Sequence, residues 1–583
     1  MKIRTAIDKC IHPLDIDSHA SSEILVNIYT GEESESSTNV HNALAIGKEQ
    51  MTLFEKGLPE SFRATLTSKV VLMSSVTDKK KKKSKNTSYN ADLIFSRVLL
   101  LLGTNQIEFD DIFDYELAAV PTSLFDESGL ARYPKNKADL MNKLKVEESS
   151  LCIKPDVTVI DGGGLLYQVH WPSDGLVKDL VDGIERYVRR LNTEVHLIFD
   201  RYKAGSIKGD TRKARVGAFR RCHQLSLDRE LPPRDMVMFS SSTKENLIEL
   251  ISKELCKRFE LNKSPNRFVV TSKSPVPEQV DNGIRTKRRD LTSYFDEADY
   301  AIPQHVHSSL IEENKKSVRV MSKDADVFAL LCHYFVKYWE NKEVYMDPFS
   351  SESKVVSIKK STHARPNIMQ SIVALHAGSG CDAVPQMYGI GKGKSLSAAE
   401  KVPLNHIGEQ DADMRDVIDE GKKFVAKCFG QSNTSSSKNR RTIWIGKTDG
   451  AKKSANPPTL KSLPPTDEAL ELNIKRAHFQ AIMWKNCVTG ILPALDPLDF
   501  GWERDGDSLR PSMLPVGRDV APEAVLQMTR CKCPSSQCTT NRCSCVKAGA
   551  SCTEYCGCQS CSNQEDINCD GDDSDVELAS EEE

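Results

Sequence analysis

The stretch Gly380-Cys381-Asp382-Ala383-Val384-Pro385-Gln386-Met387-Tyr388-Gly389-Ile390-Gly391-Lys392 decides the fold of this chain. It places the carboxylate of Asp382 seven residues before a Gly-Ile-Gly turn. Glycine has no Cβ, so the backbone of such a turn can approach another group closely. Lys392 and Lys394 add positive charge directly after the turn. What this combination means depends on the acidic residues upstream of it.

Those acidic residues follow apolar runs or come in closely spaced pairs. Val157–Ile160 precedes Asp161, Val195–Phe199 precedes Asp200, Val318–Met321 precedes Asp324 and Asp326, and Glu297 and Asp299 lie two residues apart. Carboxylates at the ends of several strands of an α/β sheet can together form a site for a hard cation. One such residue alone is ordinarily a helix N-cap, and pairs of this kind also arise by chance.

The acidic residues sit within an alternation of strands and helices. Four short, β-branched-rich runs are typical of buried parallel strands: Val157–Ile160, Val195–Phe199, Phe268–Thr271 and Val318–Met321. Segments between them, such as Leu176–Leu191 and Glu245–Phe259, have helical spacing. We therefore predict an α/β fold with a doubly wound parallel sheet over residues 151–400, and ligands at the carboxyl ends of its strands.

The order of these acidic residues and the glycine turn resembles the flap-endonuclease (XPG-like) branch of the PIN-like 5′ nucleases. Ser322-Lys323-Asp324-Ala325-Asp326 and the stretch quoted above carry the resemblance most closely, and it spans about residues 155–400. It implies a helical hairpin at the turn and two Mg²⁺ or Mn²⁺ ions. The implied metal ligands are Asp161, Asp200, Glu297, Asp299, Asp324, Asp326 and Asp382, with Asp296 as an outer neighbour. The resemblance also implies that Gly389, Gly391, Lys392 and Lys394 contact duplex phosphates.

A basic stretch directly follows Asp200. Residues 200–221 contain eight lysines and arginines against two aspartates, a net charge of +6 by 8 − 2. Such a stretch suits the binding of a phosphate strand, although a solvated helix face is the ordinary alternative. In the resembled family a basic helix at this place positions the scissile phosphate. We take Lys208, Arg212 and Arg215 as the candidates for this clamp.

A second cluster of unusual composition lies near the end of the sequence. Nine of the chain's 18 cysteines fall within 31 residues: Cys531, Cys533, Cys538, Cys543, Cys545, Cys552, Cys556, Cys558 and Cys561. Closely spaced thiolates select zinc, which takes four sulfur ligands. Nine thiols cannot supply twelve separate bonds, so three zinc ions would require bridging thiolates. The spacing resembles a tesmin-like CXC domain over residues 531–563, in which nine cysteines hold three zinc ions.

The surroundings of this cysteine module are basic. Arg530, Lys532, Arg542 and Lys547 outnumber Glu554, and we take Arg542 and Lys547 as DNA contacts. Many CXC domains carry a DNA-contacting tyrosine where this chain has Arg542, so we expect phosphate contact. A zinc-folded knob that binds another protein is the alternative.

The remaining sequence is divided by composition. We expect an N-terminal region of unknown role over 1–150, an extension and linker over 401–465, a helical segment over 466–528, the CXC module over 529–563 and an acidic, disordered tail over 564–583. The lysine-rich segment 79–85 is either a flexible linker or a nuclear-import signal. The helical segment carries an apolar stripe that suits core packing.

Bulk properties narrow the protein class. With 583 residues and a net charge of −3, the chain exceeds one ordinary core. It has no apolar leader and no apolar run near ~20 residues, so we expect a protein of the nucleus or else the cytoplasm without membrane contact. In such a compartment clustered thiols favour metal over disulfides.

Two functions fit these observations. The first is a metal-dependent, structure-selective nuclease that hydrolyses branched or single-strand-containing DNA, with RNA as a further possible substrate, and docks through its zinc module. The second is a catalytically inactive DNA- or chromatin-binding protein with the same modules. A cluster of like charges favours the enzyme, because a pure binding protein gains nothing from it. Uncharacterised animal proteins that join the two modules are similar, and a mobile-element origin is a further hypothesis. The oligomeric state is not indicated.

Overall fold

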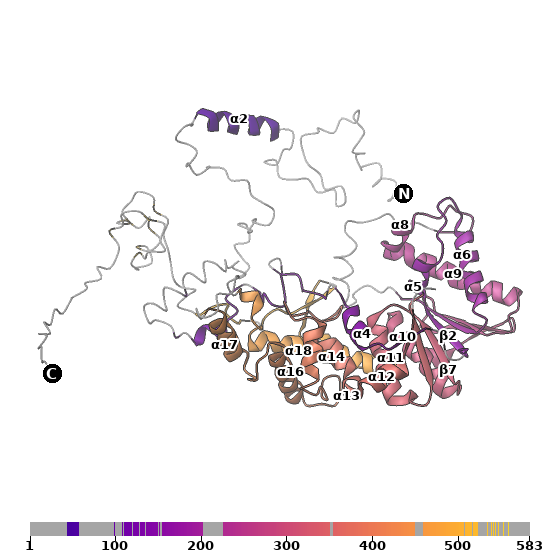
Figure 1. Ribbon diagram of the computed structural model, residues 1–583. Helices are drawn as coiled ribbons and strands as arrows, with labels where there is room; N and C mark the ends of the chain where they lie inside the picture. The colour runs from indigo at the N-terminus through magenta and orange to yellow at the C-terminus, as the bar shows by residue number, and fades with distance from the viewer. Residues whose placement is uncertain are drawn as a thin grey trace, which may run out of the picture. The chain divides into compact units, whose positions relative to one another are not determined.

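The computed structural model describes residues 43–56, 98, 108–201, 225–349, 354–448 and 459–522, with short gaps in the second and last ranges, and isolated positions from 533 to 562. The chain divides into two units, Met1–Lys85 and Asn86–Glu583. In the first unit, helix α2 (Ala43–Lys56) is described by itself. The second unit carries the sheet and every other element discussed below (Figure 1).

The centre of the second unit is a nine-stranded, mostly parallel sheet. Its strand order is β1-β9-β8-β7-β2-β3-β4-β5-β6. The strands are β1 (Glu147–Glu148), β2 (Val157–Asp161), β3 (Glu194–Ile198), β4 (Phe268–Val270), β5 (Glu278–Asp281), β6 (Ile284–Lys287), β7 (Ser317–Met321), β8 (Glu343–Asp347) and β9 (Val355–Ser357). The five middle strands, β8 to β4 in this order, run parallel, and both edges are antiparallel. The predicted α/β sheet is confirmed.

Helices cover both faces of the sheet because its strands are apolar on both sides. Val157 and Val159 of β2 enter one core with α10 (Ala298–His307), α11 (Ala325–Tyr334) and α12 (Ile358–Ala364). Ile160 of the same strand enters a second core with α5 (Gly162–Gln168), α6 (Val177–Arg190), α8 (Arg234–Met238) and α9 (Ser241–Leu261). This two-sided burial matches the alternation of side chains along a strand. The helices predicted over Leu176–Leu191 and Glu245–Phe259 are α6 and α9.

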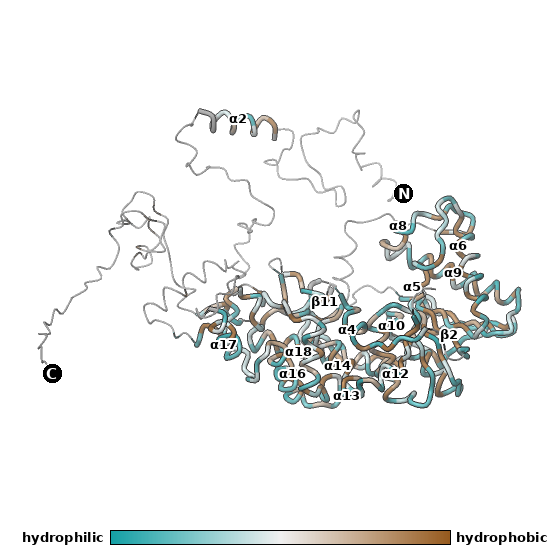
Figure 2. The backbone as a smooth tube through the Cα atoms, viewed as in Figure 1, coloured by the Kyte–Doolittle hydropathy of each residue, from teal (hydrophilic) through white to brown (hydrophobic). Residues whose placement is uncertain are grey.

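A helical layer extends the first core away from the sheet. It comprises α13 (Pro366–Gln370), α14 (Ile372–Gly378), α15 (Lys392–Ala399), α16 (Met414–Cys428) and α18 (Asp467–Lys485). Helix α18 packs on α14 and α16, which lie beside it in Figure 1, and α15 packs on α14 and α16. The predicted apolar stripe lies on α18 and is buried, from Leu470 to Trp484. It therefore packs into the core, as expected. Figure 2 shows hydrophobic stretches at β2 and at α14, and both elements contribute residues to the first core.

The boundary expected at residue 150 is wrong, because the preceding segment belongs to the sheet unit. β1 pairs with β9, and α4 (Ala138–Leu144) packs on α11 and α15. The Leu117 amide donates to the Val520 carbonyl over 2.9 Å, so this segment also contacts the far end of the described core. The two residues of this contact are several hundred positions apart in the sequence, and the composition of either segment does not indicate that they meet.

Regular structure also forms within the expected linker and at one edge of the sheet. Residues 431–465 include α17 (Ser436–Thr448), whose buried Arg440 donates to the carbonyls of Pro464 and Tyr115. The segment between β4 and α10 forms the β5–β6 hairpin at the sheet edge. Its turn is Asn282-Gly283, with positive φ at both positions, which is the favoured chemistry of a tight hairpin turn.

A small hairpin of β10 (Trp502–Asp505) and β11 (Ser508–Pro511) follows α18 and packs Trp502 on Phe479. Among the described helices, none combines the length and the apolar character required to cross a membrane.

Candidate metal site and nucleic-acid interface

The carboxylates come together because parallel strands end at the same edge of the sheet. Asp161 is the last residue of β2, and Asp200 lies two residues after the end of β3. Asp324 and Asp326 follow β7 and begin α11. Since β7, β2 and β3 are adjacent and parallel, these side chains share one edge, where ligands bind in such sheets.

The tightest group consists of Asp299, Asp324 and Asp326. One carboxylate oxygen from each lies within 4.8 Å of the others. Asp299 stands in the first turn of α10, while Asp324 caps α11 by accepting the Asp326 amide over 2.7 Å. Three carboxylates this close repel one another unless a cation lies among them. An all-oxygen set of this kind fits Mg²⁺ or Mn²⁺.

Asp326 is fully buried and is held by a histidine. Its Oδ1 lies 2.7 Å from His376 Nε2. Lys392 Nζ lies 3.3 Å from the other ring nitrogen, Nδ1. A lysine ammonium only donates, so Nδ1 accepts from Lys392 and Nε2 donates to Asp326. Burial, and next the Lys392 charge, lower the pKa of His376 to about 4, which keeps the ring neutral in this arrangement.

Asp161 and Asp200 form the adjoining part of the site. Asp161 accepts the Gly164 amide over 3.1 Å and the Ser322 hydroxyl over 3.2 Å. Burial raises the pKa of Asp161, opposed by its bond from Gly164, and the nearby Asp200 carboxylate raises it further. Ser322 Oγ also accepts the Asp324 amide over 3.1 Å, which links the end of β2 to the start of α11.

The acidic pair of α10 reaches the same edge. Asp200 accepts the amide of Ala298 over 2.8 Å, directly between Glu297 and Asp299. Glu297 occupies the N-cap position of this helix. Lys244 Nζ lies 4.0 Å from Asp200 Oδ2 and adds a positive charge. Asp296 contacts Arg201: its backbone carbonyl accepts the Arg201 amide over 2.6 Å, and its carboxylate lies 3.9 Å from the Arg201 guanidinium.

Asp382 joins the group through a lysine that the sequence did not point to. Lys137 forms an ion pair with Asp382, and its Nζ lies 3.9 Å from Asp326 Oδ2. Asp382 and Asp161 are thus both connected to the start of α11, and the structure brings them to one side of the sheet. Lys137 and Lys244 belong to no motif, so only the folded chain identifies them. Ser322 lies in the stretch Ser322–Asp326, but its contact with Asp161 is visible only in the fold.

The glycine turn lies between α14 and α15 and is open to solvent. Gly389 has φ +73°, and a Cβ added at Gly389 or Gly391 would meet no atom within 4 Å. The fold itself therefore leaves room for an external group above this turn. The exposed Lys394 donates to the Gly389 carbonyl over 2.9 Å and lies at the same surface.

Lys392 does not lie at that surface, and the expectation that it contacts phosphate is wrong. Its side chain is only 2% exposed. The ammonium donates to the Ser379 hydroxyl over 2.8 Å, to the Gly380 carbonyl over 2.5 Å and to the His376 carbonyl over 3.1 Å. Lys392 is the first residue of α15, and its side chain is among the buried residues of that helix.

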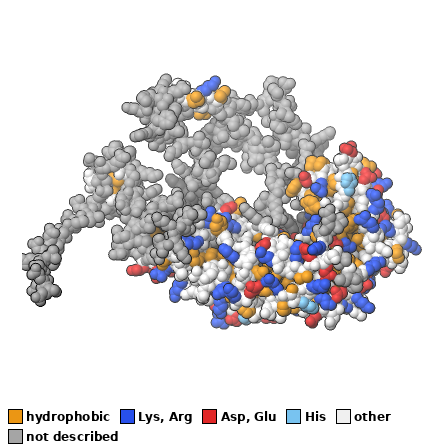
Figure 3. Space-filling model, in the orientation of Figure 1, with side chains coloured by type: hydrophobic (Ala, Val, Ile, Leu, Met, Phe, Trp, Pro, Cys, Tyr) orange, Lys and Arg blue, Asp and Glu red, His pale blue; other side chains and the backbone are white. Residues whose placement is uncertain are grey.

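An exposed aromatic residue and two further cations flank the turn. The ring centroid of Tyr388 lies 5.4 Å from the Arg132 guanidinium carbon and 5.0 Å from Lys461 Nζ. Arg132 comes from the segment before the sheet and Lys461 from the segment expected to be a linker, so sequence reasoning missed both. Elsewhere on the face shown in Figure 3, basic and acidic side chains are interspersed.

Several predicted residues lie outside the described part of the chain. They are the clamp candidates Lys208, Arg212 and Arg215, the DNA contacts Arg542 and Lys547, and the cysteines Cys531, Cys545, Cys556 and Cys561. For these the predictions stand as made.

Five cysteines of the module are described, and they form two groups. Cys533, Cys538 and Cys543 place sulfurs within 4.8 Å of one another, and so do Cys538, Cys552 and Cys558. Cys538 belongs to both groups and adopts φ +55°, an uncommon conformation for a residue other than glycine. A thiolate shared by two groups is what bridged zinc ions require.

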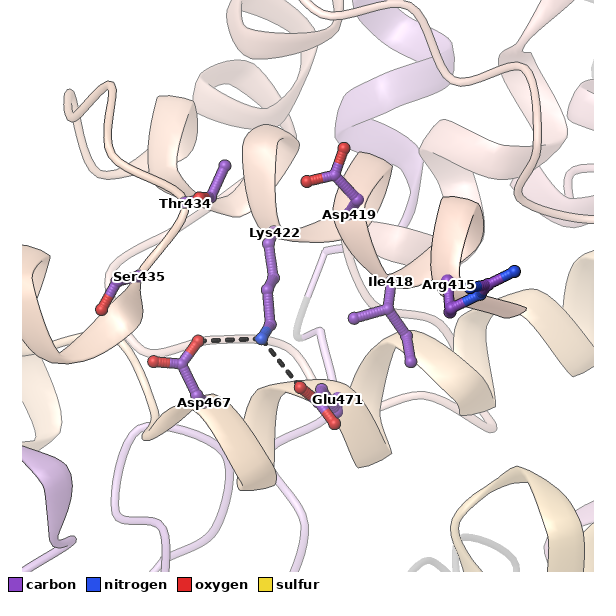
Figure 4. A pocket seen from close by; sticks show the side chains of 8 residues that line it. All are labelled: Arg415, Ile418, Asp419, Lys422, Thr434, Ser435, Asp467 and Glu471. Carbon is purple, nitrogen blue, oxygen red and sulfur yellow. Dashed lines mark hydrogen bonds and ion pairs between the residues drawn. The ribbon is translucent and has the colours of Figure 1, made fainter. Parts of the chain in front are cut away.

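A groove of about 640 Å³ lies between α16, α18 and the segment before α17 (Figure 4). None of the candidate metal ligands lines it. Lys422 crosses it to Asp467 at 3.0 Å and Glu471 at 2.7 Å. These ion pairs join the two helices, so the groove is explained by their packing.

Comparisons with known proteins bear on different parts of the chain. Residues 5–116 match a family described as a domain of unknown function (DUF8702). No curated protein matches the chain. A pseudo-enzyme–product complex of the bacteriophage T5 D15 flap endonuclease with DNA and metal ions is 12% identical with a TM-score of 0.29, over 57% of this chain and 92% of that one. The catalytic core of Rad2 with a DNA substrate is 13% identical with a TM-score of 0.28, over 58% and 91%. Both TM-scores are below 0.5 and both identities are below 25%, so neither likeness establishes a role for any residue of this chain.

Proposed function

We propose that this protein is a metal-dependent nuclease that hydrolyses phosphodiesters in branched or single-strand-containing DNA, in the nucleus. The observation that carries this proposal is the group of Asp299, Asp324 and Asp326 at the carboxyl edge of the parallel sheet. Asp161, Asp200 and Asp382 are tied to it by the contacts described above. Such a concentration of carboxylates is costly in a protein that binds no cation there.

The residues of the site would have different roles in such a reaction. Two divalent ions, when bound, would activate a water molecule and stabilise the charge of the leaving oxygen. The seven carboxylates would hold them, and His376 fixes the orientation of Asp326 through its hydrogen bond. The open turn at Gly389–Gly391, with Lys394, offers backbone amides and charge to the phosphates of the duplex. The cysteine module, loaded with about three zinc ions, would add a second contact to DNA.

One observation favours the alternative of an inactive DNA-binding protein. The Lys137 ammonium already neutralises part of the carboxylate group, as a cation would. If Lys137 occupied the place of a metal ion permanently, the protein would keep its fold and its basic surfaces but would not cleave DNA. An assay must therefore separate cleavage from binding.

The deciding experiment compares wild-type protein with Asp324→Ala and Asp419→Ala on flap, hairpin and single-stranded DNA and on RNA, in Mg²⁺ or Mn²⁺. Asp419 is an exposed carboxylate on α16 that pairs only with Lys423 among the contacts described, so it controls for charge removal. We expect cleavage by wild type and Asp419→Ala, and a loss of about 100-fold or more in Asp324→Ala. If all three shift DNA and leave every substrate intact, the inactive alternative is correct.

A further inference from the structure

Lys137 reaches the candidate metal site from a segment that no motif connects to it. Its ammonium pairs with Asp382 and lies 3.9 Å from Asp326 Oδ2. The Lys137 side chain is 19% exposed and the Asp326 side chain 1%, so this contact is largely shielded from water. Shielding strengthens the interaction between charges. Lys137 therefore acts on two of the seven proposed ligands at once.

The position of Lys137 is fixed by the fold. It stands at the N-cap position of α4, directly before Ala138. Leu140 and Leu144 anchor this helix in the first core, and α4 packs on α11, the helix that carries Asp326. The backbone that carries Lys137 is thus held beside the carboxylates by the buried apolar residues of α4.

The charges indicate what this lysine does. Oδ1 of Asp326 accepts the hydrogen bond from His376, and its other oxygen, Oδ2, is the one nearest to Lys137. In Asp382 the oxygen that pairs with Lys137 is also Oδ2. A divalent ion that used these two oxygens would meet a positive charge already in place. It would have to displace the ammonium or share the oxygens with it.

We propose that Lys137 is a resident cation of the site: a positioning residue that holds Asp326 and Asp382 together in the metal-free protein and weakens the binding of a divalent ion on that side. This inference rests on the proposed function, because it presumes that the carboxylates bind metal. It adds that a residue from the segment before the sheet lowers the metal affinity of the site.

Helix α4 offers a matched control. Lys143 lies on the same helix and is also ion-paired, with Asp139 at 3.7 Å, yet its side chain is 44% exposed and pairs with none of the candidate ligands in the described contacts. Removing the Lys143 charge changes the net charge of the protein by the same amount as removing the Lys137 charge. A general electrostatic effect on metal binding would therefore show in both variants.

The test titrates Mn²⁺ into the full chain after dialysis against metal-free buffer and measures free Mn²⁺ by electron paramagnetic resonance. The proteins are wild type, Lys137→Gln, Lys137→Arg, Lys143→Gln and Asp324→Ala. We expect Lys137→Gln to bind the ion about tenfold more tightly than wild type, because a unit charge next to a divalent ion is removed. Lys137→Arg and Lys143→Gln should match wild type, and Asp324→Ala should bind more weakly.

The outcomes separate this inference from the proposed function. If wild type binds Mn²⁺ and Asp324→Ala does not, but Lys137→Gln equals Lys143→Gln, the role of Lys137 is refuted and the metal site stands. If no protein binds Mn²⁺, the proposed function and the inference both fail. If Lys137 only stabilised the fold, Lys137→Gln would have a lower melting temperature than wild type but would not bind Mn²⁺ more tightly. That result also refutes the inference.

Discussion

The residue that most changes the interpretation of the glycine turn is Lys392. It follows the turn in sequence, yet its buried ammonium points into the protein and contacts His376, Ser379 and Gly380. Burial lowers the pKa of Lys392 to about 8, so the side chain is still mainly charged at neutral pH. The charge fixes the tautomer of His376, and His376 in turn holds Asp326. A residue expected to bind DNA thus acts on the candidate metal site.

Substitution of the two turn lysines should therefore give different results. Lys392→Met leaves buried acceptors without a donor and should lower the free energy of unfolding by about 2–4 kcal/mol, measured by urea denaturation. Lys394→Met removes an exposed charge and should change stability by less than ~0.5 kcal/mol. Lys394→Met should instead weaken DNA binding and lower its salt dependence. Equal effects of both variants on DNA binding, with equal stability, would contradict this assignment.

At the scale of elements, the strands were predictable because each is a short apolar run with a turn residue after it. Val157–Ile160 and Val318–Met321 became β2 and β7 with boundaries shifted by one residue. The carboxylates after them were predictable because they follow those strands. The β5–β6 hairpin was missed because its exposed strand β6 is polar, although Asn282-Gly283 is a recognisable turn signal. Lys137 was not predictable, since its partners lie about 190 and 245 residues away, by 326 − 137 and 382 − 137.

The cysteine module is an element whose metal content can be measured. Cys538 belongs to both described sulfur groups, whereas Cys533 belongs to one. If Cys538 bridges two ions, Cys538→Ser should lose more zinc than Cys533→Ser, with about three ions in wild type. Native mass spectrometry of the full chain gives these counts directly. Equal losses in the two variants would show that Cys538 does not bridge.

At the scale of the whole molecule, the core is closed by segments far apart in the sequence. Arg440 of α17 lies 3.5 Å from Glu116, and both side chains are buried. Each residue was assigned by composition to a region outside the core, and neither has a local signal of burial. A buried ion pair of this kind depends on both partners being desolvated together, which only the complete fold determines. The sequence therefore predicts the sheet and most of the carboxylate site, but not the segments that enclose them.

The free energy of unfolding should depend on pH, because the folded protein buries neutral histidines. His478 accepts the Gly408 amide over 2.9 Å, and burial, followed by the Lys485 charge, lowers its pKa to about 4. Burial lowers the pKa of His333 to about 3, again assisted by Lys485. The unfolded chain takes up protons below its ordinary histidine pKa of about 6.5, whereas the folded chain does not until near pH 4. Stability is therefore complete above pH 6.5 and falls as the pH decreases toward 4.

The variant that isolates this effect is His478→Gln, because glutamine can still accept the Gly408 amide and does not titrate. Between pH 7.5 and pH 5, wild type should lose on the order of 2 kcal/mol more unfolding free energy than His478→Gln, since the two pKa values are separated across 1.5 of those pH units. The exposed His363, changed to Gln, serves as the control and should follow wild type. Urea denaturation followed by circular dichroism at several pH values measures the slopes. Parallel slopes for wild type and His478→Gln would mean that His478 becomes protonated in the folded protein, and that Lys485 and burial do not keep it neutral.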